Sequence, residues 1–281
     1  MATIIDGKAA AAEYKAEIRR EAERLRSEGK EPCLAVIIVG SDPASRVYVT
    51  NKEKDCAECG IKSVEYALPE DTAQDELMEL VVKLNGDKSV SGLLVQLPLP
   101  RHLDETAVLL AIDPKKDVDA FHPYNVGKIM TGDFDFLPCT PAGVMALLDR
   151  YGIDPSGKEC VIVGRSNIVG KPQAMLLLHR NGTVTICHSR TKDLSEVCRR
   201  ADILVSAVGK RGIIRADMVK EGAVVIDVAI NRGEDGRLCG DAAFDEVSAK
   251  VSFITPVPGG VGPMTRVMLL KNTLKACELY Q

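Results

Sequence analysis

The chain has 281 residues, of which 46% are hydrophobic and 27% are charged, a balance typical of folded globular proteins. The formal net charge of -4 is mild and neither half of the chain is strongly basic, which argues against a nucleic-acid partner. No apolar run approaches the roughly 18 residues that a membrane span requires, so we expect no membrane association. Residues 1–20 include Asp6, Glu13 and Glu17 instead of a cationic and then apolar signal, and we expect a cytoplasmic protein.

In the first half of the chain, apolar runs alternate with helical patterns, which predicts a parallel sheet with crossover helices. Asp42 and Pro43 are typical of a helix start, and Thr72 with Asp75 resembles a capping box. The expected strands are 33–40, 62–68 and 92–100, and the expected helices are about 14–29, 42–59, 72–86 and 104–112.

Residues 114–138 show little periodicity, which in a compact protein usually indicates a functional or connecting segment. A helix is expected from Thr140 to about Tyr151, and a second α/β unit follows it. Its expected strands are 160–164, 183–187, 201–209, 223–230 and 251–257, and a final helix is expected at 265–279. We therefore predict an α/β fold with two α/β domains.

The chain contains nine cysteines, of which only Cys56 and Cys59 lie close together, as a single CxxC. A zinc site requires a second such pair or suitably spaced histidines, and the sequence has neither. A redox CxxC usually begins a helix, whereas this one precedes Gly60 at an expected helix end. We therefore expect unreactive thiols in a reducing compartment and no metal site.

The segment VIVGRSNIVGKP, residues 161–172, has the outline of a phosphate-binding turn between a strand and a helix. Gly164 and Gly170 would let backbone N–H groups approach a phosphate at the helix start, although their spacing is longer than in the usual dinucleotide motif. Such a loop can also be an ordinary connection, but the surrounding strand–helix–strand pattern favours nucleotide binding.

The next strand indicates which cofactor this loop binds. An NAD site usually has an acidic residue about 20 residues further on, whereas TVTICHSRT is followed by no acid until Asp193. The polar side chains near both strand ends can instead donate hydrogen bonds to a 2′-phosphate, and they are Arg165, Ser166, Ser189 and Arg190. The sequence therefore predicts NADP.

Several polar residues in the first half suggest a second part of the site. Tyr48 and Lys52 lie four residues apart on one expected helix face, although a helical lysine is usually only solvated. Gln96 follows an apolar strand, at the edge where open α/β sheets bind ligands. Asp119 lies between Val118 and Ala120 in the irregular segment. In the second half, the proline- and glycine-rich residues 255–265 form either a tight turn or a wall against a flat ligand.

Eight segments occur in order and at similar spacing along nearly the whole chain: YVTNK, GLLVQLPLP, PKKDVDAFHPYNVGK, PCTPAG, VIVGRSNIVGKP, HSRT, ADILVSAVG and ITPVPGGVGPMT. Together they resemble the bifunctional methylenetetrahydrofolate dehydrogenase/cyclohydrolase family. This resemblance implies that NADP takes a hydride from methylenetetrahydrofolate, and that water then opens the methenyl product to 10-formyltetrahydrofolate.

The resemblance also implies roles for individual residues. Lys52 is expected to be the general acid/base of the hydrolysis, with Gln96 hydrogen-bonded to it. Tyr48 is expected to stack on or position the folate, and Asp119 to accept the N–H groups of its amino-pyrimidine end. The other implied contacts are Pro258, Gly259, Gly262 and Thr265 for the pterin, and Gly164, Arg165, Ser166, Ser189, Arg190 and Ile230 for NADP.

By the same resemblance, residues 1–139 with 263–281 form a folate-binding catalytic domain and residues 140–262 a Rossmann-like NADP domain. The two are expected to flank a cleft, to be joined by long helices, and to form a homodimer through the cofactor domain. One departure is Ala229, which stands where the family usually has glycine, so that its methyl group could crowd the nicotinamide side next to Ile230. The alternatives are a monofunctional dehydrogenase, another two-domain NADP oxidoreductase such as a shikimate-type enzyme, and a non-catalytic nucleotide-binding protein.

Overall fold

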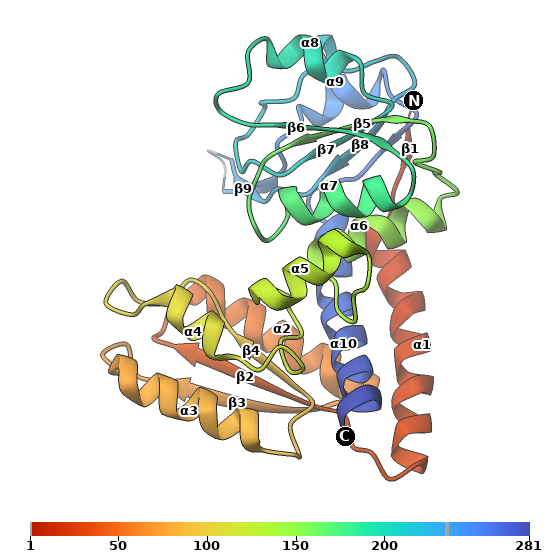
Figure 1. Ribbon diagram of the computed structural model, residues 1–281. Helices are drawn as coiled ribbons and strands as arrows, with labels where there is room; N and C mark the ends of the chain where they lie inside the picture. The colour runs from red at the N-terminus through yellow and green to blue at the C-terminus, as the bar shows by residue number, and fades with distance from the viewer. Residues whose placement is uncertain (1, 234–235) are drawn as a thin grey trace. The chain divides into compact units, whose positions relative to one another are not determined.

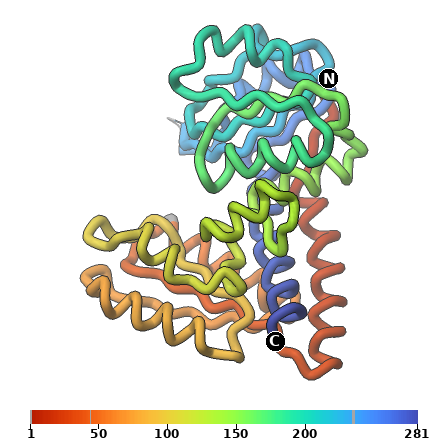
Figure 2. Tube along the Cα trace, in the orientation of Figure 1, coloured from red at the N-terminus to blue at the C-terminus, as the bar shows by residue number. Residues whose placement is uncertain are grey.

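The structure is a computed structural model that describes residues 2–233 and 236–281. The chain forms two compact units, which confirms the two-domain α/β fold: unit 1 contains the residues up to Ala12 and Thr140–Thr265, and unit 2 contains Glu13–Cys139 and Arg266–Gln281. Two long helices, α1 (Gly7–Ser27) and α10 (Val261–Tyr280), begin in unit 1 and continue in unit 2, so the red and the blue ends of the chain occur in both units (Figure 2).

Unit 1 is built on a six-stranded parallel sheet of order β1-β11-β8-β7-β5-β6. Its strands are β1 (Thr3–Ile4), β5 (Glu159–Val163), β6 (Thr183–Cys187), β7 (Ile203–Ser206), β8 (Val224–Asp227) and β11 (Phe253–Ile254). Helices lie on both faces of the sheet (Figure 1), namely α6 (Cys139–Arg150), α7 (Gly170–His179), α8 (Leu194–Arg199) and α9 (Phe244–Ser248). A 3-10 helix, η1 (Ala216–Met218), and a separate two-stranded sheet of β9 (Asn231–Arg232) and β10 (Leu238–Cys239) complete this unit.

The residues up to Ala12 belong to unit 1, whereas the domain boundaries expected from the sequence grouped them with the folate-binding domain. In the structure, β1 pairs with β11 in the sheet of unit 1, with Thr3 opposite Phe253 and Ile4 opposite Ile254. Gly7 then passes so close to the backbone that an added Cβ would lie 1.7 Å from the carbonyl oxygen of Gly260. The two-residue strand β1 is too short to produce a sequence pattern of its own.

Unit 2 contains a three-stranded parallel sheet of order β3-β2-β4, with β2 (Cys33–Val39), β3 (Lys62–Leu68) and β4 (Gly92–Val95). Every residue of the central strand β2 is buried, as expected for a strand covered on both faces. The helices α3 (Gln74–Gly86) and α4 (Glu105–Ala111) cover one face, where Leu77, Val81 and Val108 pack against Ile37. The other helices of the unit are α2 (Pro43–Cys59) and α5 (Pro123–Thr131).

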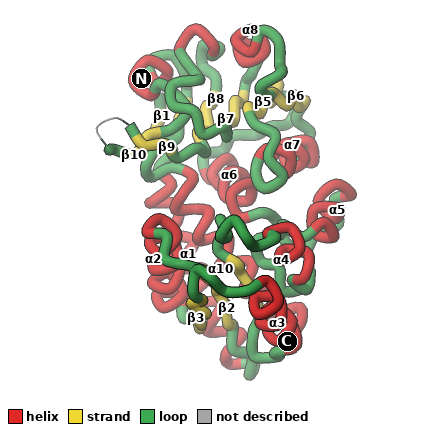
Figure 3. The backbone as a smooth tube through the Cα atoms, turned by 90° about the vertical axis from the view of Figure 1, so that its left-hand side faces the viewer, coloured by secondary structure: helices red, strands yellow, loops and turns green. Residues whose placement is uncertain are grey.

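The sequence predicted most of these elements, but not β1, β9, β10, η1 or α5. Helix α5 lies inside the segment that was expected to be irregular (Figure 3). The expected capping box at Thr72 is wrong, because the Thr72 hydroxyl donates to the carbonyl of Pro69, and Ala73 precedes α3 without a side-chain cap. The last helix also begins at Val261, four residues earlier than expected.

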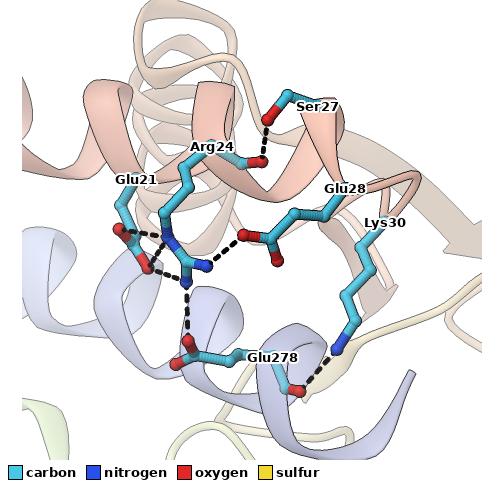
Figure 4. A network of polar contacts seen from close by, with 6 residues as sticks. All are labelled: Glu21, Arg24, Ser27, Glu28, Lys30 and Glu278. Carbon is cyan, nitrogen blue, oxygen red and sulfur yellow. Dashed lines mark hydrogen bonds and ion pairs between the residues drawn. The ribbon is translucent and has the colours of Figure 1, made fainter.

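Within unit 2, the end of α1 is tied to the end of α10 by a surface network of charges (Figure 4). The Arg24 guanidinium donates to Glu21 and Glu28 of its own chain segment and to Glu278 of α10, at 2.5–2.6 Å. Lys30 Nζ donates to the carbonyl of Glu278 at 2.7 Å. This network holds the C-terminal helix against α1. No helix in the described part of the chain is both long and apolar enough to cross a membrane.

Candidate active site

Lys52 and Gln96 are brought together by a helix and a strand end of unit 2. The Asp42 carboxylate accepts from Ser45 N at 2.7 Å and caps the start of α2, and Gly60, at φ 71°, ends it. Gln96 directly follows β4, and its N–H donates to the carbonyl of Ile37 at 2.8 Å. The Nζ of Lys52 donates to Oε1 of Gln96 at 3.0 Å, so the predicted pairing of these two side chains is present.

Tyr48 lies one helical turn before Lys52 on α2, and its side chain is exposed. The amide nitrogen of Gln96 donates to the carbonyl of Leu97 at 2.7 Å, which orients the amide so that its oxygen is the atom that meets Lys52. The exposed ring of Tyr48 therefore lies one helical turn from the half-buried amine of Lys52, whose acceptor, Gln96 Oε1, is fixed.

Asp119 lies in a sharp turn that the same unit holds in place. Ala120 adopts φ 57°, a left-handed conformation that costs energy for any residue with a side chain. The turn is held by Asp117, whose carboxylate accepts from His122 N at 2.8 Å and from Asn125 Nδ2 at 2.9 Å. The thiol of Cys139 contacts Oδ1 of Asp119 at 3.5 Å.

Burial and charge act in opposite directions on the titratable groups of this site. Burial lowers the pKa of Lys52 below its ordinary value, and the charge of Asp119 opposes this effect. Burial likewise raises the pKa of Asp119, and here the charge of Lys52 opposes it. Burial and the Asp119 charge also keep the pKa of the Cys139 thiol well above its usual range, so this thiol stays protonated.

In unit 1, the glycine-containing turn after β5 is tightly folded. Gly164 has φ 133°, and a Cβ added to it would lie 2.7 Å from the carbonyl oxygen of Ala207. A Cβ on Gly170, the first residue of α7, would lie 2.3 Å from the carbonyl oxygen of Gly164. The Ser166 hydroxyl accepts from Val169 N and Gly170 N, at 3.1 and 3.2 Å. Only glycine fits at these two positions.

The predicted 2′-phosphate donors follow two neighbouring strands. Val163 of β5 pairs with Cys187 of β6, so the residues after each strand lie at the same edge of the sheet. The turn after β6 is fixed by His188, whose N–H donates to Thr191 Oγ1 at 2.8 Å and whose Nδ1 accepts from Arg190 N at 3.1 Å. The donor side chains are all exposed, and they are Arg165, Ser166, Ser189 and Arg190.

Ile230 follows β8 and is 48% exposed, as a contact for a bound ring requires. The backbone at Ala229, where the family usually has glycine, is unstrained. Its side chain is buried, its φ is not in the left-handed region, and its N–H donates to Asp227 Oδ1 at 3.2 Å. Alanine is therefore accommodated here without the backbone strain that would require glycine.

Residues 255–265 form a constrained turn of unit 1 that leads into α10. Gly259 has φ 106°, and a Cβ on Gly260 would lie 2.6 Å from the carbonyl oxygen of Pro256. By contrast, a Cβ on Gly262 would meet nothing within 4 Å. The hydroxyls of Thr265 and Thr140 are hydrogen-bonded at 3.0 Å, and Pro258 is exposed.

The structure thus brings Lys52, Gln96 and Asp119 together in unit 2, which also contains Tyr48, and it places the other predicted residues in unit 1. Sequence reasoning missed the residues that support Asp119. Cys139 was present in the quoted segment PCTPAG but had no assigned role, and Asn272 belongs to α10, whose apolar pattern gave no sign of it. Asn272 Nδ2 donates to the carbonyls of Val118 and Leu137, at 2.7 and 2.9 Å.

Two family models match the chain. The catalytic domain of tetrahydrofolate dehydrogenase/cyclohydrolase matches residues 5–119, and the NAD(P)-binding domain of the same enzyme matches residues 138–281. The chain belongs to the tetrahydrofolate dehydrogenase/cyclohydrolase family.

Relatives in this family match the chain over nearly its whole length. The bifunctional protein FolD of Acetivibrio thermocellus is 63% identical over 278 residues, which cover 99% of this chain and 98% of the relative. The crystal structure of the bifunctional enzyme FolD from Campylobacter jejuni matches with 54% identity and a TM-score of 0.97, over 99% of both chains. The Trypanosoma brucei enzyme, solved with NADP and an inhibitor, matches with 40% identity and a TM-score of 0.94, over 99% of this chain and 97% of its own.

As a tetrahydrofolate dehydrogenase/cyclohydrolase, the chain is a bifunctional one-carbon folate enzyme. It oxidises 5,10-methylenetetrahydrofolate to the 5,10-methenyl compound with NADP, and it hydrolyses that product to 10-formyltetrahydrofolate.

Proposed function

We propose that Lys52 is the general acid/base of the hydrolysis, with Gln96 as the group that positions it. The observation that supports this role is the 3.0 Å hydrogen bond from Lys52 Nζ to Gln96 Oε1, made by an amine whose pKa is lowered by burial. A lysine whose pKa is lowered holds its proton less tightly than an ordinary solvated lysine, so it is better suited to accept a proton and give it back in the reaction.

In the proposed reaction, water attacks the methenyl carbon and Lys52 Nζ accepts the proton that the water loses. The bond from this carbon to N5 of the pterin then breaks, and the Lys52 ammonium returns its proton to N5. As this bond breaks, the hydroxyl oxygen on the carbon loses its proton to solvent and becomes the carbonyl oxygen of the formyl group on N10, so the overall reaction releases one proton. The Gln96 oxygen accepts a hydrogen bond from Lys52 throughout and keeps the amine in one orientation.

We assign folate binding in unit 2 to Asp119 and Tyr48. The Asp119 carboxylate is half-buried and fixed by the turn at Ala120, so it can accept the paired N–H groups of an amino-pyrimidine without first being ordered. Tyr48 offers an exposed ring, on which a flat ligand can stack. In unit 1, we assign the pterin-contacting backbone to Pro258, Gly259, Gly262 and Thr265.

We assign NADP binding to the turn after β5 and to the residues beside it in unit 1. The turn at Gly164 and Gly170 packs so closely that any side chain there would collide with backbone, which is typical of a loop that approaches a diphosphate. Arg165, Ser166, Ser189 and Arg190 present exposed donors, and no carboxylate lies among them to repel a 2′-phosphate. Bound NADP supplies the hydride acceptor, and the exposed Ile230 gives its nicotinamide ring an apolar contact.

The proposal also includes the domain assignment, assembly and location. Unit 2 is the folate-binding catalytic part and unit 1 the NADP-binding part. The enzyme acts in the cytoplasm as a homodimer, as its resemblance to the family implies. Light scattering after gel filtration tests the dimer, since a monomer at micromolar concentration would contradict it.

Ultraviolet progress curves of the purified enzyme test the proposed site. Methylenetetrahydrofolate is supplied with NADP or NAD, and methenyltetrahydrofolate is supplied separately at near-neutral pH. We expect NADPH formation, little activity with NAD, and methenyl loss above the spontaneous rate. A preference for NAD would contradict the 2′-phosphate assignment, and spontaneous-rate hydrolysis would contradict the role of Lys52.

A further inference from the structure

A buried carboxylate in unit 1, Asp241, joins two loops at one edge of the sheet. Asp241 is 0% exposed and accepts four hydrogen bonds. Its Oδ2 accepts from Ser206 Oγ and Val208 N, both at 2.8 Å. Its Oδ1 accepts from Lys210 N at 2.7 Å and from Asn231 Nδ2 at 3.1 Å. These donors precede Asp241 by 10 to 35 residues.

The segment that contains Asp241 is itself held on both sides by a second carboxylate, Asp227. Oδ2 of Asp227 accepts from Ala242 N at 2.7 Å. A Cβ on Gly240 would lie 2.0 Å from the same oxygen, so a side chain there would displace the Asp227 carboxylate. Asp241 therefore occupies one fixed place, and the two loops that bond to it are fixed in turn.

Both loops adjoin the proposed cofactor contacts. Ala207 N donates to the carbonyl of Val163 at 2.8 Å, and Ala207 O is the atom that a Cβ on Gly164 would meet, so residues 207–210 run beside the glycine turn. The second loop contains Ile230, directly before Asn231. Val208 and Ile230 are large apolar side chains that are 44% and 48% exposed.

We propose that Asp241 is a positioning residue for NADP binding, which holds the loops of Val208 and Ile230 together as the apolar surface that meets the nicotinamide ring. This inference rests on the proposed function, because it takes Ile230 as a cofactor contact. Asp241 touches neither cofactor nor folate in this account. It acts through its hydrogen bonds to the Ser206 hydroxyl, to the backbone N–H groups of Val208 and Lys210, and to the side chain of Asn231.

A carboxylate is needed at this position because each oxygen faces two donors. In Asp241→Asn, one oxygen becomes an NH2 group, which then faces the backbone N–H of either Val208 or Lys210. A buried donor directed at another donor loses its hydrogen bond and must move away. The size of the side chain is unchanged, so the substitution tests the bonds and not the packing.

The experiment compares Asp241→Asn with wild type and with Asp202→Asn as a matched control. Asp202 is a carboxylate of the same unit that also accepts a backbone N–H, from Glu159 at 2.9 Å, but it precedes β7 and so lies at the opposite edge of the sheet. For Asp241→Asn, we expect the calorimetric Kd and the KM for NADP to rise at least tenfold. The KM for methylenetetrahydrofolate and the cofactor-free rate of methenyl hydrolysis should stay within twofold. Asp202→Asn should bind NADP within twofold of wild type.

The inference is overturned if Asp241→Asn binds NADP like wild type and its circular dichroism spectrum shows that it is folded. If this variant does not fold, Ser206→Ala and Asn231→Ala decide, since each removes one donor. The inference is supported if each of these two variants binds NADP about threefold more weakly and still hydrolyses the methenyl compound. It is overturned if both variants bind NADP with unchanged affinity. Wild-type enzyme that fails to bind NADP would instead refute the proposed function itself.

Discussion

Replacing Gln96 with glutamate would put a carboxylate where an amide oxygen now accepts a hydrogen bond from Lys52 at 3.0 Å. With the effective dielectric constant of about 20 that suits such sites, opposite charges at this distance attract by about 5.5 kcal/mol. This attraction stabilises the ammonium form of Lys52 against the neutral amine. Each 1.4 kcal/mol is about a factor of ten, so even half of the attraction lowers the neutral fraction about a hundredfold. We therefore expect Gln96→Glu to slow methenyl hydrolysis at least a hundredfold near neutral pH.

The assay is the loss of methenyl absorbance between about pH 6 and 9, corrected for the spontaneous rate. In the variant, the rise of the rate with pH should move to higher pH, because a more basic lysine loses its proton later. Gln96→Ala is the control, since it removes the hydrogen bond without adding a charge, and its rate should not show this alkaline displacement. Wild-type hydrolysis by Gln96→Glu, with an unmoved pH profile, would refute the assignment of Lys52 as the base.

Three further predictions concern the substrate, the cofactor and stability. Asp119→Ala should raise the KM for methylenetetrahydrofolate at least tenfold and leave the Kd for NADP unchanged, and wild-type folate affinity would count against the role of Asp119. Gly164→Ala should weaken NADP binding at least tenfold while methenyl hydrolysis continues, because its Cβ would lie 2.7 Å from Ala207 O and its φ is 133°. Burial raises the pKa of Asp227 from 3.8 to about 6, so its contribution to stability is full below about pH 3.8 and is lost as the pH rises through 6. Asp227→Asn lacks this titration, so between these limits its unfolding free energy should rise relative to that of wild type by roughly 3 kcal/mol as the pH rises. Urea unfolding at several pH values from about 4 to 7 measures this, and a free-energy difference that does not change with pH would contradict the prediction.

Local signals in the sequence predicted much of the fold. Helix α2 begins after Asp42, with Pro43 as its first residue, and ends before Gly60, as the intrinsic preferences of these residues predict. Strand β3 begins and ends where its apolar residues indicated. Helix α5 was missed because its signals are weak. Its N-cap is His122, its buried side chains are only Asn125 and Ile129, and two of its large apolar side chains face solvent.

The sequence predicted those residues of the candidate site whose own side chains are expected to act on a ligand. Lys52 and Gln96 are examples, and the structure places them in hydrogen-bond contact. The supporting residues were not predictable, because their bonds join distant parts of the chain. Asn272 reaches Val118 across 154 positions, and Asp241 reaches Ser206 across 35. No periodicity or turn preference encodes such contacts, since they arise only when the folded elements meet.

The most direct test of the central claim is to measure both activities of Lys52→Met in the same preparation. Methionine keeps most of the length and apolar stem of lysine but cannot move a proton. Our account predicts that methenyl hydrolysis falls to the spontaneous rate, while NADP-dependent oxidation of methylenetetrahydrofolate remains measurable and methenyltetrahydrofolate accumulates. Hydrolysis at the wild-type rate in this variant would contradict the account, because the proton transfer would then belong to another group.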